Sequence, residues 1–206
     1  MISGIVLAAG ASSRMGQAKA ALPLGQTGET VVARVVRTLL EGGVPNVVVV
    51  AGAHIDAVRA AMPRHESRAR VVEHLGWEQG QLSSLLAGLD AIDDPLIEAA
   101  VVTLVDVPLV RSSTVAEVIA AWRRTRAPIV RPAEGNRHGH PVIFDRSIFA
   151  DLRSADPNTG AKAVFAIHRE RIINVEVNDE GAFKDIDTPP DYNEVLRADG
   201  PTGSRK

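Results

Sequence analysis

Residues 5–19 read Ile5-Val-Leu-Ala-Ala-Gly-Ala-Ser-Ser-Arg-Met-Gly-Gln-Ala-Lys19. The apolar run at 5–9 predicts a short buried strand that opens into a loop of small residues, in which the only cations are Arg14 and Lys19. Gly10 lets the backbone approach an anion, the two serines add hydroxyl and amide donors, and the two cations offset the charge of a triphosphate. The stretch therefore predicts a phosphate-binding loop. A tight strand-to-helix turn with two surface cations is the alternative interpretation.

The composition indicates an ordinary globular protein. With 206 residues, a net charge of -2 and 45% hydrophobic residues, the chain is long enough for one large domain or at most two small ones. There is no basic excess and only 3% of the residues are aromatic, so we expect no nucleic-acid partner. The lack of cysteine excludes disulfides, thiolate nucleophiles, iron-sulfur clusters and cysteine zinc sites. Any metal must be held by oxygen or histidine.

The N-terminus carries no charged segment ahead of its apolar run, and this run is too short for a signal peptide. No stretch approaches the roughly 20 apolar residues that a membrane helix needs. We therefore expect a cytoplasmic protein without a membrane partner.

Strands and helices alternate along the chain. Thr30 is predicted to cap a helix with a helical apolar period from 31 to 40, and Gly42-Gly43 end it. The apolar runs on either side of this helix, 5–9 and 47–50, are continuous, which indicates a parallel sheet covered on both faces. Further strands are predicted at 70–73, 100–105, 129–132 and 171–177, the last of them at an edge.

Three further helix starts carry polar residues beside free amide donors. Thr114 and Glu117 have the spacing of a capping box, so Ser113 or Thr114 is predicted to cap a helix. Residues 80–84 lie in the first turn of a predicted helix that has an apolar stripe of leucines. From the local sequence alone, the serine and glutamine residues are interpreted as helix caps. Residues 156–162 open a helix whose start favours an anion, although a surface cap is the simpler interpretation.

Two acidic segments are candidate metal ligands. Asp106-Val-Pro108 follows the strand at 100–105, and a carboxylate there lies in the crevice where open sheets bind ligands and suits magnesium. Near the C-terminus, Asp185-Ile-Asp-Thr-Pro-Pro-Asp191-Tyr192 predicts a short strand and a helix start. Either segment can also be a turn former or a cap. His138 and His140 lie close together, but two histidines are too few for a metal site.

Separated segments resemble, in order, the nucleotidyltransferases similar to the molybdenum cofactor guanylyl- and cytidylyltransferases, the MobA-like and MocA-like family. The opening stretch matches the signature Leu-Ala-Ala-Gly-x-Ser-x-Arg-Met-Gly followed by Lys. The other matching segments are Trp77-x-x-Gly-Gln-x-Ser-Ser-Leu85, Asp106-x-Pro108, Gly139-His-Pro141 and Asp185-x-Asp-Thr-Pro-x-Asp-Tyr192. The resemblance implies one three-layer, Rossmann-like (GT-A-like) α/β nucleotidyltransferase domain over 2–195, with a mostly parallel sheet that is mixed at its edge. A flexible polar tail is expected at 196–206.

The resemblance also implies an activity. The chain is expected to transfer a nucleotidyl group from a nucleoside triphosphate, CTP being favoured, to an anionic phosphorylated acceptor, with release of pyrophosphate. The favoured acceptor is the molybdopterin-bound molybdenum cofactor. Asp106 and Asp187 are implied to bind Mg²⁺, and the implied catalytic residues are Arg14, Lys19 and Asp106. The residues expected to bind the nucleotide are Leu7, Ala8, Ala9, Gly10, Ala11, Ser12, Ser13, Arg14, Lys19, Gly52, Gly80, Gln81, Ser83 and Ser84. Those expected to bind the acceptor are Gly139, His140, Thr159, Gly160 and Lys162.

Several alternatives stay open on the sequence. The donor can be GTP, and the acceptor can be a sugar or polyol phosphate. A non-catalytic nucleotide-binding module that serves as a partner of a molybdoenzyme maturation factor is a candidate of another class. Two departures from the family pattern bear on the base and acceptor contacts: His74-Leu75 replaces a common Asn-Pro pair, and Lys162 replaces an arginine of some cytidylyltransferase-like members.

Overall fold

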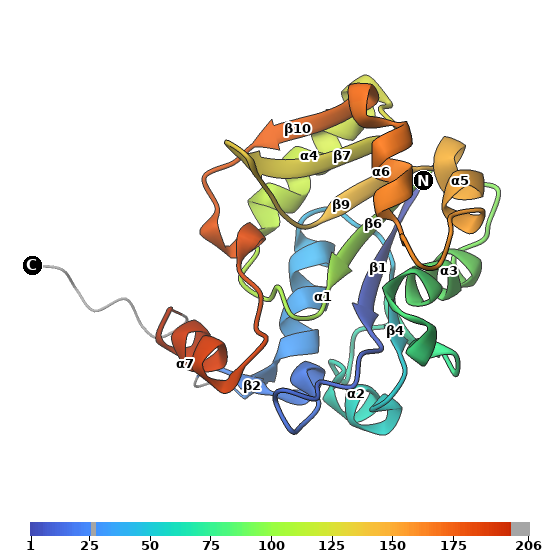
Figure 1. The fold of residues 1–206 in the computed structure, drawn as a ribbon. Helices are drawn as coiled ribbons and strands as arrows, with labels where there is room; N and C mark the ends of the chain where they lie inside the picture. The colour runs from blue at the N-terminus through green and yellow to red at the C-terminus, as the bar shows by residue number, and fades with distance from the viewer. Residues whose placement is uncertain (26–27, 199–206) are drawn as a thin grey trace, which may run out of the picture.

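The computed structural model describes residues 1–25 and 28–198 and shows an α/β fold with a mostly parallel central sheet (Figure 1). The strands follow the order β10-β7-β9-β6-β1-β4-β5, and β8 pairs with β7 outside this path. The strands of the sheet are β1 (Ile2–Ala8), β4 (Val47–Ala51), β5 (Ala69–Glu73), β6 (Ala99–Leu104), β7 (Ile129–Glu134), β8 (Arg137–His138), β9 (Val142–Asp145) and β10 (Ile172–Glu176). A separate two-stranded sheet pairs β2 (Pro23–Leu24) with β3 (Glu29–Thr30).

β1 is the centre of the sheet and is buried along its whole length. It runs parallel to β4 on one side and to β6 on the other, with Leu7 opposite Val50 and Leu104. The continuous apolar run arises because both faces of the strand are covered. The carboxyl ends of the three strands therefore meet at the same edge, and the loops that follow them lie side by side.

The sheet is mixed in its interior, which corrects the expectation of a mixed edge. β9 runs antiparallel to β6 and β7, its neighbours on either side, whereas the edge strand β10 is parallel to β7. The reason is the connection after β7. The chain turns back at Gly135, where φ is +58°, so that it returns through β8 and inserts β9 between β6 and β7.

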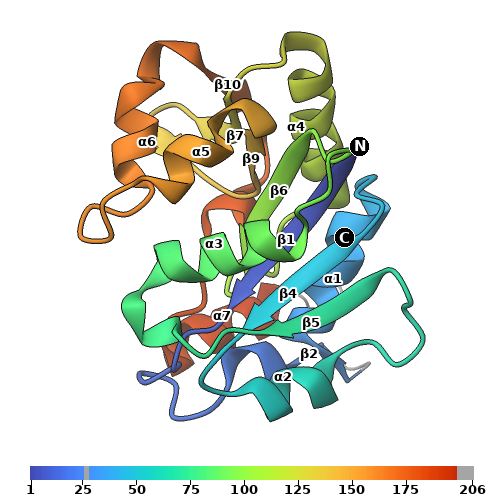
Figure 2. The ribbon, with the colours of Figure 1, turned by 90° about the vertical axis from the view of Figure 1, so that its right-hand side faces the viewer.

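Helices cover both faces, giving the expected three layers. α1 and α4 lie on one face of the sheet, and α3, α5 and α6 lie on the other (Figures 1 and 2). The helices are α1 (Val31–Glu41), α2 (Ile55–Ala61), α3 (Gln81–Ala91), α4 (Ser112–Thr125), α5 (Phe149–Arg153), α6 (Lys162–Ile167) and α7 (Pro189–Ala198). Among the described residues, no helix has the length and apolar character that crossing a bilayer requires.

The prediction of the helix start is confirmed for α1 and is wrong for α4. Thr30 caps α1 by accepting a hydrogen bond of 3.2 Å from the Ala33 amide. The capping box predicted for α4 is absent, because the helix begins at Ser112 and Thr114 is buried. The Thr114 hydroxyl donates instead to the Asp179 carboxylate, at 2.6 Å.

The C-terminal segment partly differs from its prediction. Residues 185–187 form no strand, and the Ile186 amide donates to the Asp106 carbonyl at 2.8 Å. The predicted helix start is confirmed: α7 begins at Pro189, a residue that suits the first helical position. This helix continues to Ala198, so the tail expected from 196 begins inside it. The remainder of that tail, 199–206, lies outside the described residues.

We expect the Asp179→Ala variant to lower the free energy of unfolding by about 2–4 kcal/mol. Asp179 is 3% exposed, and its carboxylate accepts hydrogen bonds from the Arg111 amide at 2.9 Å, from the Thr114 hydroxyl and from the Gly181 amide. Urea denaturation measures the change. The matched control is the exposed Glu117 on α4, where alanine should change stability by no more than about 0.5 kcal/mol. Equal losses in the two variants would contradict the anchoring role of Asp179.

Candidate active site

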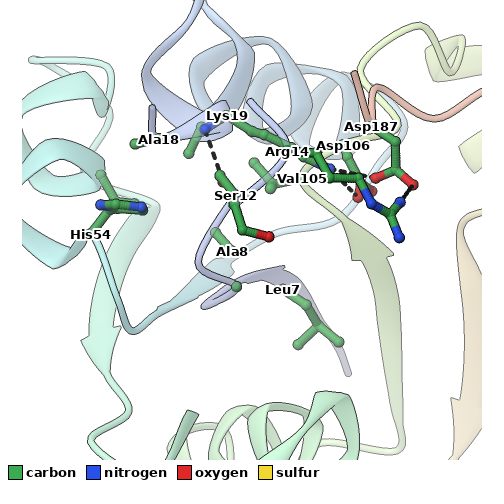
Figure 3. Close-up of a pocket in the computed structure, with 14 residues that line it drawn as sticks. Leu7, Ala8, Ser12, Arg14, Ala18, Lys19, His54, Val105, Asp106 and Asp187 are labelled. Carbon is green, nitrogen blue, oxygen red and sulfur yellow. Dashed lines mark hydrogen bonds and ion pairs between the residues drawn. The ribbon is translucent and has the colours of Figure 1, made fainter. Parts of the chain in front are cut away.

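A pocket of about 220 Å³ lies beyond the carboxyl ends of β1, β4 and β6 (Figure 3). Such an edge is where open α/β sheets bind their ligands, because the loops that leave neighbouring strands converge there. The residues lining this smaller pocket are Leu7, Ala8, Gly10, Ser12, Ser13, Arg14, Ala18, Lys19, Ala20, His54, Val58, Val105, Asp106 and Asp187. The opening loop and both predicted metal ligands are therefore part of one pocket.

The loop after β1 has a backbone shape that its small residues permit. Ser12 and Gly16 have positive φ values of 50° and 68°. The Ser12 carbonyl accepts from the Met15 amide at 2.9 Å, and its hydroxyl accepts from the Lys19 amide at 3.2 Å. A Cβ added to Gly10 would meet nothing within 4 Å, so the space beside this glycine is open. Ser12 thus holds the loop closed on itself, and Gly10 leaves its backbone accessible.

Lys19 joins the two predicted metal ligands. Its Nζ lies 2.5 Å from Oδ1 of Asp187 and 3.6 Å from Oδ2 of Asp106. Arg14 contacts the other oxygen of Asp187, with 3.0 Å between its guanidinium nitrogen and Oδ2. Figure 3 shows the carboxylates of Asp106 and Asp187 facing the same point from different segments of the chain. Two carboxylates are brought together here by a cation between them.

The two carboxylates have opposite electrostatic environments. Burial raises the pKa of Asp106, an effect that the Lys19 charge opposes and the nearby negative charge of Asp185 and Asp187 reinforces. The pKa of Asp187 is lowered, chiefly by its hydrogen bond from Lys19. Asp187 is therefore the more firmly ionised member of the pair, and Asp106 is the member that a bound cation would stabilise most.

The residues present fit a divalent cation. Oδ1 of Asp106 is buried and has no hydrogen-bond partner among the described residues, which is the state of an oxygen reserved for a ligand. No cluster of three or more acidic, histidine or cysteine side chains within 1–25 and 28–198 could hold a metal by itself. Mg²⁺ is commonly bound by one or two carboxylates together with substrate phosphates and water, so Asp106 and Asp187 suit this mode.

His54 lines the smaller pocket and is not among the site residues that the sequence predicts. Its Nε2 lies 2.9 Å from the Ala11 carbonyl, so the ring fastens the β4–α2 connection to the opening loop. Figure 3 shows it on the opposite side of the pocket from Asp187. A single histidine in a loop of small residues carries no local signal, and Gly52 is the only neighbouring residue that the sequence predicts to bind the nucleotide.

A larger pocket of about 400 Å³ lies between α3, the strands β7 to β9 and α6. It contains all five residues predicted for the acceptor and also Gln81, which was predicted for the nucleotide. Its lining residues are Leu7, Gln81, Leu82, Leu85, Val102, Leu104, Arg131, His138, Gly139, His140, Val142, Phe144, Pro157, Asn158, Thr159, Gly160, Ala161, Lys162 and Phe165. Leu7 lines both pockets, so they adjoin at the end of β1. Arg131 and Asn158 had no motif to reveal them.

The Gly139-His-Pro141 element is held tightly against the C-terminal segment. A Cβ on Gly139 would lie 2.2 Å from the Ala182 carbonyl oxygen, so no side chain fits there. The His140 amide donates to the same carbonyl at 2.9 Å. Burial lowers the pKa of His140, and its Nδ1 has no partner within the described chain. His138 is exposed. The two histidines thus have different surroundings, and no metal pair is formed.

The other predicted nucleotide residues line neither pocket: Ala9, Ala11, Gly52, Gly80, Ser83 and Ser84. A Cβ on Gly52 would lie 2.6 Å from the Cβ of Trp77, so this glycine serves close packing. The Ser83 hydroxyl donates to the Gly80 carbonyl at 2.7 Å and lies 2.9 Å from Nε2 of His74. Ser84 is buried. Their contact with a nucleotide stays a prediction, and their visible role is to shape the start of α3.

Comparison with known proteins gives a consistent family. The family model described as the MobA-like NTP transferase domain matches residues 4–172. The chain is 31% identical to the nicotine blue oxidoreductase of Paenarthrobacter nicotinovorans over 193 residues, which cover 91% of this chain and 92% of the relative. It is 33% identical to the probable molybdenum cofactor guanylyltransferase of Mycolicibacterium paratuberculosis over 137 residues, 66% of each chain.

Solved structures agree with the fold. Rv0371c from Mycobacterium tuberculosis H37Rv superposes with a TM-score of 0.80 at 29% identity, covering 96% of this chain and 98% of that chain. A crystal structure of the same protein in complex with manganese superposes with a TM-score of 0.74 at 28% identity and the same coverage.

We expect Asp106→Asn to raise the free energy of unfolding near neutral pH by about 0.5–2 kcal/mol, because the substitution removes a buried charge that destabilises the fold. The folded-state pKa of Asp106 is raised, so its ionised form disfavours folding at pH values above that pKa. As the pH falls through the folded-state pKa, Asp106 takes up a proton and the penalty is lost. Urea denaturation of both proteins across the acidic range measures this. A variant that is less stable than the parent near neutral pH would contradict the assignment.

Proposed function

Because the chain belongs to the MobA-like NTP transferase domain family, we propose that it transfers a nucleotidyl group from a nucleoside triphosphate to a phosphorylated acceptor and releases pyrophosphate. The proposed donor is CTP, and the proposed acceptor is the molybdopterin-bound molybdenum cofactor. The observation that carries the proposal is the buried Oδ1 of Asp106, which has no hydrogen-bond partner in the described part of the chain and belongs to the carboxylate that Lys19 links to Asp187.

The triphosphate is proposed to bind in the smaller pocket. The open backbone at Gly10 and the Ser13 side of the loop offer amide and hydroxyl donors, and Lys19 and Arg14 supply positive charge. Both cations are paired with Asp187 in the structure. They therefore exchange a carboxylate for phosphate oxygens when the nucleotide binds.

Asp106 and Asp187 are proposed to hold Mg²⁺ next to the α-phosphate. When bound, this ion supplies charge neutralisation for the phosphates and for the departing pyrophosphate. The two carboxylates come from the end of β6 and from the segment ahead of α7, and the hydrogen bond from the Ile186 amide to the Asp106 carbonyl fixes their relative position. Their task is to orient charge and not to move a proton.

The acceptor is proposed to occupy the larger pocket. Because Leu7 lines both pockets, a phosphate at their junction faces the smaller pocket, where its oxygen attacks the α-phosphorus in line with the leaving pyrophosphate. A terminal phosphate is ionised near neutral pH and is already a nucleophile. Positioning and charge neutralisation can then account for catalysis without a serine or histidine nucleophile or a general base.

The choice of CTP rests on the serine-bearing opening loop, on the sequence Gly80-Gln-x-Ser-Ser84 and on Gly139-His-Pro141, which are similar to the cytidylyl branch of the family. The guanylyltransferase relatives make GTP the second candidate donor. A sugar or polyol phosphate is the alternative acceptor. A non-catalytic partner of a molybdoenzyme maturation factor is disfavoured, since such a module has no use for the Asp106, Asp187 and Lys19 cluster.

The name of the Paenarthrobacter relative supplies a candidate of another class, an oxidoreductase. The two carboxylates around a lysine favour nucleotidyl transfer, since hydride transfer has no need of an acid pair beside a phosphate-binding loop. Assays for reduction and for pyrophosphate release on the same preparation separate the two activities.

Pyrophosphate release tests the donor. With molybdopterin cofactor as acceptor and Mg²⁺ present, we expect release with CTP to exceed release with GTP by about tenfold or more, a ratio that a few base-specific hydrogen bonds provide. Release with GTP and none with CTP would overturn the cytidylyl proposal. Release only with a sugar or polyol phosphate would overturn the proposed acceptor.

Replacement of Asp106 by Asn tests the acid pair. We expect kcat/KM to fall at least about a hundredfold, the usual cost of removing one group that stabilises charge in the transition state. The matched control is Asp185→Asn, an exposed carboxylate two positions from Asp187 that lines neither pocket. A circular dichroism melt of each variant checks that it is folded. Unchanged turnover in the Asp106 variant would contradict the proposed metal ligands.

A further inference from the structure

The larger pocket carries positive charge that the chain does not neutralise. Its lining contains no aspartate or glutamate, and it contains Arg131 from β7, His138 from β8 and Lys162 from the start of α6. Within residues 1–25 and 28–198, none of these three side chains forms an ion pair with a carboxylate. The smaller pocket differs, because there Lys19 and Arg14 are already paired with acids.

Arg131 is held in place by neutral groups. Its Nε donates to Oδ1 of Asn174 at 3.0 Å, and this pair is set by the register of β7 with β10. Its guanidinium carbon lies 5.3 Å from the centre of the Phe165 ring. The two terminal nitrogens have no hydrogen-bond partner among the described residues. A fixed guanidinium with free terminal donors matches the geometry of a phosphate or carboxylate.

The surroundings of Arg131 also indicate uncompensated charge. Burial lowers the pKa of Arg131. Although His138 is exposed, partial desolvation and then the charge of Arg131 lower the pKa of its ring. An anion between these side chains would remove both penalties, because an opposite charge stabilises the ionised form of each.

Apart from Gln81, His140, Asn158 and Thr159, the side chains in the remainder of the pocket lining are apolar. Leu82 and Leu85 project from α3, and Phe144 and Phe165 face them from β9 and α6, with an edge-to-face contact of 5.8 Å between the two ring centres. Hydroxyl groups placed against this wall would lose their hydrogen bonds to water without replacement. A polyol chain is therefore disfavoured there, whereas a ring with few polar groups is accommodated.

We infer that Arg131, together with Lys162 and His138, binds an anionic group of the second substrate, and that the body of this substrate is an apolar or aromatic ring and not a polyol. The inference rests on the proposed function for the identity of the pocket as the acceptor site. It adds Arg131 and His138 as residues that determine which acceptor is bound.

Isothermal titration with phenyl phosphate tests the inference on the whole chain, because this probe combines a ring with a phosphate. We expect the parent protein to bind phenyl phosphate more tightly than glycerol phosphate or phenol. Arg131→Gln should weaken phenyl phosphate binding by roughly tenfold or more, since hydrogen bonds to a charged group are lost. Lys162→Gln should weaken it in the same direction and provides a second variant should the first fail to fold.

Arg137→Gln is the matched control. Arg137 precedes His138 on β8, but it is paired with Glu134 and Glu180 and does not line the larger pocket. We expect this variant to bind phenyl phosphate as the parent does. Equal affinity of the folded Arg131 and Lys162 variants and the parent would overturn the inference, as would tighter binding of glycerol phosphate than of phenyl phosphate.

CTP binding in the presence of Mg²⁺, measured on the same samples, separates this inference from the proposed function. The Arg131 and Lys162 variants should retain the CTP affinity of the parent, because neither residue lines the smaller pocket. A parent that binds neither CTP nor GTP would refute the proposed function. Loss of phenyl phosphate binding with CTP binding intact supports the inference, and loss of both in the Arg131 variant would overturn it.

Discussion

The ammonium group of Lys19 between the carboxylates of Asp106 and Asp187 is the interaction on which the site depends. Lys19 follows β1 and contacts Asp187, which lies 168 positions further along the chain, ahead of α7. Lys19 also contacts Asp106, which follows β6. The sheet makes this contact possible because β1 and β6 are parallel neighbours and release their loops at one edge. Asp191 completes the arrangement by accepting hydrogen bonds from the amides of Asp187 and Thr188.

The sequence predicted the sheet wherever local pattern and tertiary environment agree. The continuous apolar runs became β1, β4 and β6, and Thr30 caps α1 as expected, because a buried parallel strand and an N-cap each have a direct signature. The position of β9 inside the sheet could not be predicted, since strand order is decided by long-range pairing. The predicted start of α4 was wrong for a related reason. The Thr114 hydroxyl contacts the buried carboxylate of Asp179, which lies 65 positions away in the sequence, and does not cap the helix.

The candidate site was predictable to the same extent. Glycine and serine at the end of a strand indicate an anion-binding loop. The structure places Gly10 and Lys19 of this loop in one pocket with Asp106 and Asp187. The residues predicted to bind the acceptor likewise lie together in the larger pocket. His54 and Arg131 carried no signal because single side chains gain meaning only from their neighbours. The sequence predicts that Gly52 binds the nucleotide, whereas the structure packs it against Trp77, and its local sequence does not distinguish the two roles.

A crystal structure of the chain with CTP and Mg²⁺ would show whether Lys19, Asp106 and Asp187 form the nucleotide site. We predict a cation bound to Asp106 and Asp187, with Oδ1 of Asp106 as a ligand, and the triphosphate along the loop after β1. The Lys19 ammonium is then expected to contact phosphate oxygens in place of Asp187. A triphosphate bound elsewhere, with the contact between Lys19 and Asp187 unchanged and no cation at Asp106, would contradict this prediction.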